Sequence, residues 1–196
     1  MSNAFFQKTS FDDSINCWDT SRVIDMNHMF REATDFNQPL NDWNVASVNN
    51  MQFMFREATD FNQPLDDWNV ARVIDMKDMF YNAQFFNQPL DDWNVASVND
   101  MASMFQDATN FNQCLSSWAK APADVNVNDI FEDSGCPNKN PVATVGPWCQ
   151  GEDEICIAPS STPSDFPSFL PTNLPSNAPT TSPTKKQKKK SKKRKK

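Results

Sequence analysis

The sequence predicts an α/β solenoid of about four to five coils, each 25 residues long, followed by a disordered tail. Two observations carry this prediction. Tryptophan recurs every 25 residues, at Trp18, Trp43, Trp68, Trp93 and Trp118. Eight of the nine methionines fall at two further positions of the same period. A fixed period of this length is typical of units that bury their apolar faces by stacking on their neighbours.

Each unit divides into two predicted elements. Leu65, Trp68 and Val70 indicate a short strand that turns Trp and Val to one side. The apolar residues that follow have helical spacing, at Val73, Met76, Met79, Phe80 and Ala83. Asn87 and Pro89 then end the predicted helix. We expect the tryptophans to pack in the core, and a recurring asparagine to form a buried ladder that binds turn backbone: Asn37, Asn62, Asn87 and Asn112.

Composition argues against most enzyme classes, and we predict no catalytic residue, no cofactor and no metal site. The chain has one histidine and three glycines in 196 residues. A nucleophilic triad would therefore depend on His28, which occupies a variable position of the predicted helix and is expected at the surface. The glycines are too far apart for a phosphate-binding loop. No apolar run is long enough to span a membrane.

Outward positions of the predicted strands give the best candidate contact surface. They are polar and acidic in three consecutive units: Asp42, Asn44, Asp67, Asn69, Asp92 and Asn94. Aligned faces of repeat proteins serve extended binding, so we expect a protein or glycan ligand here. Paired carboxylates such as Asp66 and Asp67 also suggest a calcium ladder, but no glycine-rich calcium turn accompanies them, which favours a solvated acidic stripe.

The repeat has a recognisable form, F-N-Q-P-L-x-x-W-N-V-x-x-V-x-x-M-x-x-M-F-x-x-A-x-x-F. It resembles the 25-residue repeat of BspA-like leucine-rich-repeat surface proteins, also known as the mycoplasma-lipoprotein-type repeat, over about residues 4–118. The resemblance implies a leucine-rich-repeat-like solenoid that mediates adhesion or other protein contacts without catalysis. Members of that family normally carry a secretion signal, and the first residues of this sequence do not read as one.

The first repeat is incomplete, because Ala4 and Phe5 align with Met29 and Phe30. This favours a truncated sequence whose signal peptide is missing, and an extracellular or cell-surface location. We assign the repeats to residues 1–120 and a cysteine-containing C-terminal cap to residues 121–157. The simplest bridge in that cap joins Cys136 to Cys149, which would imply an oxidising compartment; free thiols are the alternative.

Two low-complexity segments follow the cap. Residues 158–184 contain seven copies of P-[S/T]-x-x, which predicts an extended, disordered spacer that is either glycosylated or unmodified. Residues 185–196 hold ten Lys or Arg and carry a charge of +10, whereas residues 1–184 carry −17. We expect this tail to contact an extracellular polyanion such as an acidic polysaccharide, without specific recognition of nucleic acid; an electrostatic anchor for anionic lipid is an alternative. The alternative function is an intracellular scaffold that the tail directs to the nucleus.

Overall fold

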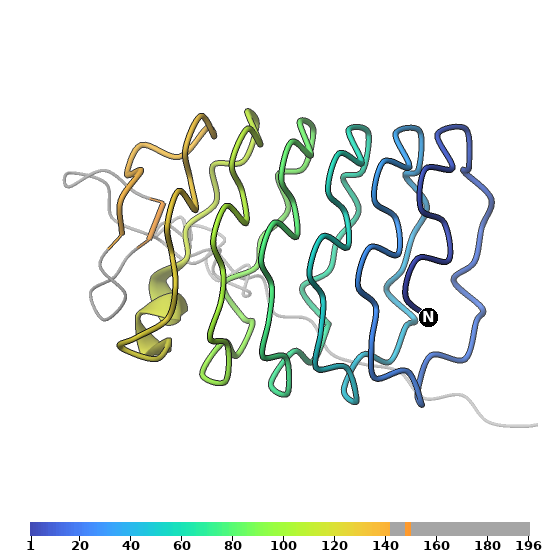
Figure 1. Ribbon diagram of the computed structural model, residues 1–196, viewed down its shortest axis with the longest axis horizontal. Helices are drawn as coiled ribbons and strands as arrows, with labels where there is room; N and C mark the ends of the chain where they lie inside the picture. The colour runs from blue at the N-terminus through green and yellow to red at the C-terminus, as the bar shows by residue number, and fades with distance from the viewer. Residues whose placement is uncertain (142–147, 150–196) are drawn as a thin grey trace, which may run out of the picture. The chain divides into compact units, whose positions relative to one another are not determined.

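The computed structural model describes residues 1–141 and 148–149, all of which belong to one compact unit (Figure 1). In this unit the chain winds into a row of similar coils stacked side by side. The spacer, the basic tail and most of the second half of the cap lie outside the described residues. Within the described residues, no helix has the length and apolar character needed to cross a membrane.

Backbone hydrogen bonds join each coil to the next, mostly between residues that are 24 to 26 positions apart. Met26 N–H donates to Asn50 O at 3.0 Å, and Phe30 N–H donates to Met54 O at 2.8 Å. Isolated parallel bridges connect the coils at one point, pairing Asp25 with Asn50, Asn50 with Asp75, Asp75 with Asp100 and Asp100 with Asn126. The last step is one residue longer, because the final unit carries a one-residue insertion. The period of the sequence is therefore the length of one coil.

The local elements differ from those we predicted. In the part of the chain that the structure describes, the only helix is the short 3₁₀ helix η1, Ser116–Lys120. The apolar run after Val73 forms a series of tight turns, because Asp78 and Asn82 adopt left-handed backbone angles, with φ of 52° and 51°. Met79 N–H donates locally to Met76 O, whereas Phe80 N–H donates to Met104 O of the next coil. The predicted α-helix over this run is therefore wrong.

The segment predicted as a strand is also irregular. Trp68 N–H donates back to Leu65 O at 3.1 Å, which closes a turn instead of a sheet ladder. Trp68 and Val70 nevertheless both point inward, as alternation predicted, and each is nearly fully buried. The sidedness of each residue was predicted correctly although the backbone conformation was not.

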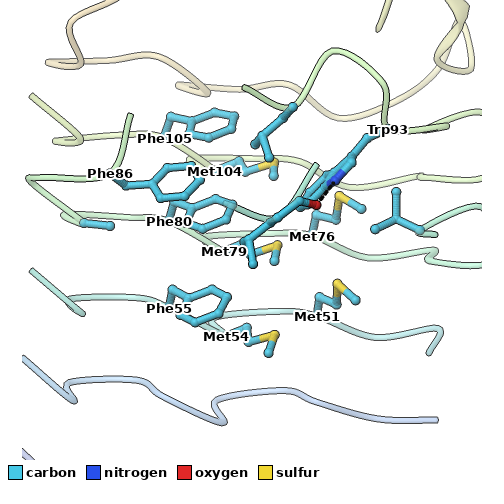
Figure 2. Packing of buried hydrophobic residues seen from close by; sticks show 14 of the residues in the cluster. Met51, Met54, Phe55, Met76, Met79, Phe80, Phe86, Trp93, Met104 and Phe105 are labelled. Carbon is cyan, nitrogen blue, oxygen red and sulfur yellow. Dashed lines mark hydrogen bonds between the residues drawn. The ribbon is translucent and has the colours of Figure 1, made fainter. Parts of the chain in front are cut away.

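The core is a set of side-chain ladders that run along the stack. Phe55, Phe80 and Phe105 lie one above another (Figure 2), with ring centroids 5.5 Å apart at both steps. Met79 lies beside Phe80, and both are fully buried. The tryptophans form a second ladder. Each indole N–H donates, at 2.9 to 3.1 Å, to a backbone carbonyl of the preceding coil. The acceptor is the carbonyl of a leucine, or of Ile15 at the leucine position of the first coil: Trp43 to Ile15, Trp68 to Leu40, Trp93 to Leu65 and Trp118 to Leu90. Core packing of these four tryptophans is confirmed; Trp18, in the first coil, is 41% exposed.

The hydrogen bonds of the asparagine ladder are confirmed at the turn that follows each buried phenylalanine, but the predicted burial is wrong, because these asparagines are half-buried or exposed at the edge of the stack. Asn62 N–H donates to Asn37 Oδ1, and Asn87 N–H donates to Asn62 Oδ1, both at 3.0 Å. Asn112 continues the series, and Asp12 begins it by accepting from Asn37 N–H at 2.9 Å. Each side chain therefore satisfies one backbone donor of the next coil, which a turn cannot satisfy by itself.

The C-terminal end of the stack is closed covalently. Cys136 and Cys149 form a disulfide with their Cα atoms 4.7 Å apart. Cys114 is also disulfide-bonded, and Cys17 is an exposed free thiol. Gly135 lies so close to the preceding coil that a Cβ atom there would come within 2.8 Å of Phe111 O. Only glycine fits this approach, where the chain folds back onto the last coils.

Candidate interaction surface

The six predicted contact residues all lie on the surface of the stack. We call Asp42, Asn44, Asp67, Asn69, Asp92 and Asn94 the acidic strip; every one of them is exposed. In each coil the aspartate and the asparagine flank a tryptophan that is 2 to 3% exposed. The buried indole ring holds the turn against the core, so the two polar side chains on either side of it point outward.

The three asparagines of the acidic strip have a structural role that we did not predict. Asn44 Oδ1 accepts a hydrogen bond from Ala46 N–H at 3.1 Å, and Asn69 and Asn94 make the same bond at 3.2 Å. This is an Asx turn, in which the side chain replaces a backbone acceptor. The carbonyl oxygen is therefore occupied, and the exposed amide NH₂ is the part of the side chain left to donate to a ligand.

The first coil has an aspartate at the asparagine position. Asp19 Oδ1 accepts from both the backbone N–H and the hydroxyl of Ser21, at 3.0 and 2.6 Å. These two hydrogen bonds, that of the hydroxyl first, lower the pKa of Asp19 below its ordinary value. The row of turns therefore ends in a carboxylate that is charged at neutral pH.

The three aspartates of the acidic strip differ in the number of hydrogen bonds that their carboxylates accept. Asp42 accepts hydrogen bonds from Asn16 Nδ2 at 2.7 Å and from Asn41 Nδ2 at 3.3 Å. Asp67 and Asp92 form no hydrogen bond or ion pair with any residue that the structure describes. The strip therefore presents open acceptor oxygens whose charge is not neutralised.

The spacing along the acidic strip is set by the ladder beneath it. The Trp68 and Trp93 rings have centroids 6.5 Å apart and planes within 1° of parallel. Because Asp67 and Asp92 each precede one of these rings, their carboxylates recur at about one coil spacing. Like charges this close repel one another, so a cation or a row of hydrogen-bond donors laid along the strip relieves that repulsion.

A shallow hollow ends the acidic strip where η1 replaces the next regular turn. It is lined by Asp91, Asp92, Trp93, Asn94, Val95, Ser117 and Lys120. The Asp91 carboxylate is occupied by Ser116 Oγ and Ser117 N–H, both at 2.7 Å. Lys120 is exposed and lines the same hollow as Asp92, without forming an ion pair with it. The sequence signal for this change was the S-S-W-A-K segment, which departs from the repeat, and we did not read it as part of the surface.

The residues considered for catalysis and metal binding do not gather into a reactive site. His28 packs against Phe53, with ring centroids 4.5 Å apart, and its pKa is lowered by burial and then by Arg31 and Arg56. Among the described residues, no three His, Cys, Asp or Glu side chains lie close enough together to hold a metal ion. Asp66 and Asp67, which also suggested a calcium ladder, are both exposed.

Comparison with known proteins agrees with the repeated architecture. A family model matches residues 1–85 and, in an overlapping second match, residues 61–143. No curated protein and no solved structure matches the chain. The two matches together cover well over half of the 196 residues and fall on the stacked coils. The chain therefore belongs to the family described as "Mycoplasma protein of unknown function, DUF285", and it is a repeat protein of the Mycoplasma type.

Proposed function

We propose that this chain is a non-enzymatic binding protein, a leucine-rich-repeat-like solenoid that uses the acidic strip to hold a protein or glycan ligand. The observation that carries the proposal is the alignment of six exposed polar side chains on consecutive coils over a rigid aromatic core. Repeat proteins use such extended faces for recognition. The resemblance to BspA-like surface proteins supports a role in adhesion or other protein contacts.

The acidic strip has a defined chemical preference. Asp67 and Asp92 offer carboxylate oxygens that have no partner in the described part of the chain, and Asn69 and Asn94 offer amide donors. Alternating acceptors and donors suit the hydroxyl groups of a sugar or the basic and amide side chains of a protein. The negative charge of the strip disfavours sulfated or phosphorylated ligands at this surface.

We further propose that the protein acts outside the cell or on its surface. The disulfide between Cys136 and Cys149 and the second disulfide at Cys114 support this, because disulfides persist in oxidising compartments. The ten Lys and Arg of residues 185–196 would then hold a polyanion. The same tail supports the second candidate, a nuclear scaffold, which the disulfides disfavour.

Arrays of glycans and of extracellular proteins test the proposed function. We would compare the full chain with the triple variant Asp42→Asn/Asp67→Asn/Asp92→Asn. The control carries Asp13→Asn/Asp60→Asn/Asp124→Asn, which removes the same charge from three exposed aspartates outside the acidic strip. We expect at least one ligand that binds the wild type and the control but not the strip variant. Binding that is equal for all three chains, or no binding to either array, would contradict the proposal.

A further inference from the structure

A second exposed surface lies along the parallel bridges that join the coils. Ile24 is 62% exposed and Ile74 is 47% exposed, although both lie next to fully buried methionines. Backbone hydrogen bonds hold them in one row, since Asn49 N–H donates to Ile24 O at 3.0 Å and Ile74 N–H donates to Asn49 O at 2.9 Å. Asn99 continues the row by donating to Ile74 O at 2.8 Å. The outward side chains of four consecutive coils are therefore in register: Ile24, Asn49, Ile74 and Asn99.

The residues of this row alternate with a period of two coils. Each isoleucine has an arginine two positions before it, as Arg22-x-Ile24 and Arg72-x-Ile74, whereas the coils between carry serine and asparagine. We call Arg22, Ile24, Arg72 and Ile74 the Arg–Ile patch. Bridged segments of neighbouring coils lie about 4.8 Å apart. Ile24 and Ile74 lie two coils apart, so the Arg22–Ile24 half of the patch is separated from the Arg72–Ile74 half by about 10 Å.

The arginines of the Arg–Ile patch are free to meet a ligand. Both are exposed, and neither forms an ion pair with a residue that the structure describes. Arg56 differs from them, because its guanidinium contacts Asp78 at 2.6 Å and Glu57 at 3.1 Å. Asp25 and Asp75, which follow the two isoleucines in sequence, each accept a hydrogen bond from the backbone amide two residues on, and Asp75 also accepts one from Gln52 Nε2.

We propose that the Arg–Ile patch binds an acidic amphipathic helix of a partner protein, which lies along the stack. One heptad of an α-helix spans about 10.5 Å, which matches the two-coil spacing of the patch. Leucines at heptad spacing would cover Ile24 and Ile74, while glutamates beside them would pair with Arg22 and Arg72. The isoleucines favour a protein over a sulfated polysaccharide, because a polyanion has no use for exposed apolar side chains. This surface shares no residue with the acidic strip.

The repeat itself supplies a variant that should fold. Arg22→Ser/Ile24→Asn/Arg72→Ser/Ile74→Asn introduces the residues that the intervening coils already carry at the same positions, Ser47 and Asn49. A second variant, Arg22→Ser/Arg72→Ser, removes only two exposed charges. The Asp42→Asn/Asp67→Asn/Asp92→Asn chain serves as the control, because it leaves the Arg–Ile patch intact. All are made in the full chain, so the basic tail contributes equally to each.

The probe is a labelled, side-chain-stapled helical peptide of about three heptads, with leucine at every seventh position and glutamate on both flanks of the leucines. Fluorescence anisotropy would measure its affinity at low and at physiological salt. We expect binding to the wild type and to the acidic-strip control, a loss of tenfold or more in the four-residue variant, and an intermediate loss in the arginine variant. The affinity of a matched peptide with lysine in place of glutamate should be no lower for the four-residue variant than for the wild type, because lysine gains nothing from Arg22 and Arg72.

Three results would overturn the proposal. The first is equal affinity of the peptide for the wild type and the four-residue variant, which would mean that the basic tail alone holds it. The second is an equal loss of affinity for the glutamate and the lysine peptides in the four-residue variant. The third is binding of a sulfated polysaccharide that the four-residue variant loses while no peptide binds, which would assign the patch to polyanions. Since the acidic-strip control is measured beside them, failure here is distinguishable from failure of the proposed function.

Discussion

Replacing Asn62 tests how the coils are joined. Its Oδ1 atom accepts from Asn87 N–H at 3.0 Å and from Gln88 Nε2 at 2.9 Å. In Asn62→Ala the Asn87 N–H loses its partner in a partly buried turn, which costs about 1–3 kcal/mol. Gln88 Nε2 keeps its hydrogen bond to the backbone Asn62 O at 3.0 Å in the variant, so losing its second acceptor adds little to the loss of stability. We expect a loss of about 1–2 kcal/mol and a fall in Tm of about 2–8 °C.

The first coil provides the control for this variant. Asp12 occupies the position of Asn62 there and accepts the same backbone hydrogen bond from Asn37 N–H at 2.9 Å. Asn62→Asp keeps the acceptor oxygen and should stay within about 0.5 kcal/mol of the wild type, the range usual for a surface substitution. Urea unfolding followed by circular dichroism, with equal m-values required, measures both variants. If Asn62→Ala and Asn62→Asp are equally stable, the asparagine ladder does not join the coils.

Three further predictions concern buried side chains. Trp93→Phe removes the indole donor to Leu65 O, which then keeps only the hydrogen bond from Trp68 N–H, so urea unfolding should show a loss of about 0.5–1.5 kcal/mol; an unchanged midpoint would refute this. Burial and neighbouring arginines lower the pKa of His28, so the unfolded state binds its proton more tightly, and stability should decline as pH falls below about 6.5. Thermal unfolding across this range should show a weaker decline in His28→Asn, and parallel curves would contradict the assignment. Burial raises the pKa of Asp78 despite its contact with Arg56, so the protonated form is favoured in the folded state. The wild type should therefore lose stability relative to Asp78→Asn as pH rises from about 3.8 through the folded pKa; the opposite trend in urea midpoints would show that the ion pair outweighs burial.

The period of the sequence was sufficient to predict the stacked coils, the inward residues and the hydrogen bonds of the asparagine ladder. It was not sufficient to predict the backbone conformation. Apolar residues spaced like those from Val73 to Ala83 lie on one face of a helix, but they also lie on one face of a series of tight turns. The turns require left-handed residues, and here these are side-chain-bearing residues such as Phe53, with φ of 56°, instead of glycine. Nothing in that residue type signals a left-handed angle.

The candidate surface was predicted in position but not in detail. Alternation around a buried tryptophan placed Asp67 and Asn69 outward correctly. The Asx turn at Asn69 was readable in principle, since asparagine followed by a small residue two positions on is a common turn signal. Lys120 was missed because it lies where the repeat ends, and the geometry of that end depends on η1 and on the disulfides. The Arg–Ile patch was missed, although asparagine at the equivalent positions 49 and 99 indicates that Ile24 is exposed, whereas Ile15 occupies a position that is otherwise leucine.

The affinity of the array-identified ligand for a stepwise series of acidic-strip variants tests the central claim most directly. Isothermal titration would be done on the wild type, on Asp67→Asn, on Asp67→Asn/Asp92→Asn and on the triple variant that adds Asp42→Asn. We predict that affinity falls at each step, because each carboxylate lies in the same row and contacts the same extended ligand. Unchanged affinity across the series, with every variant folded, would contradict the assignment of the acidic strip as the binding surface.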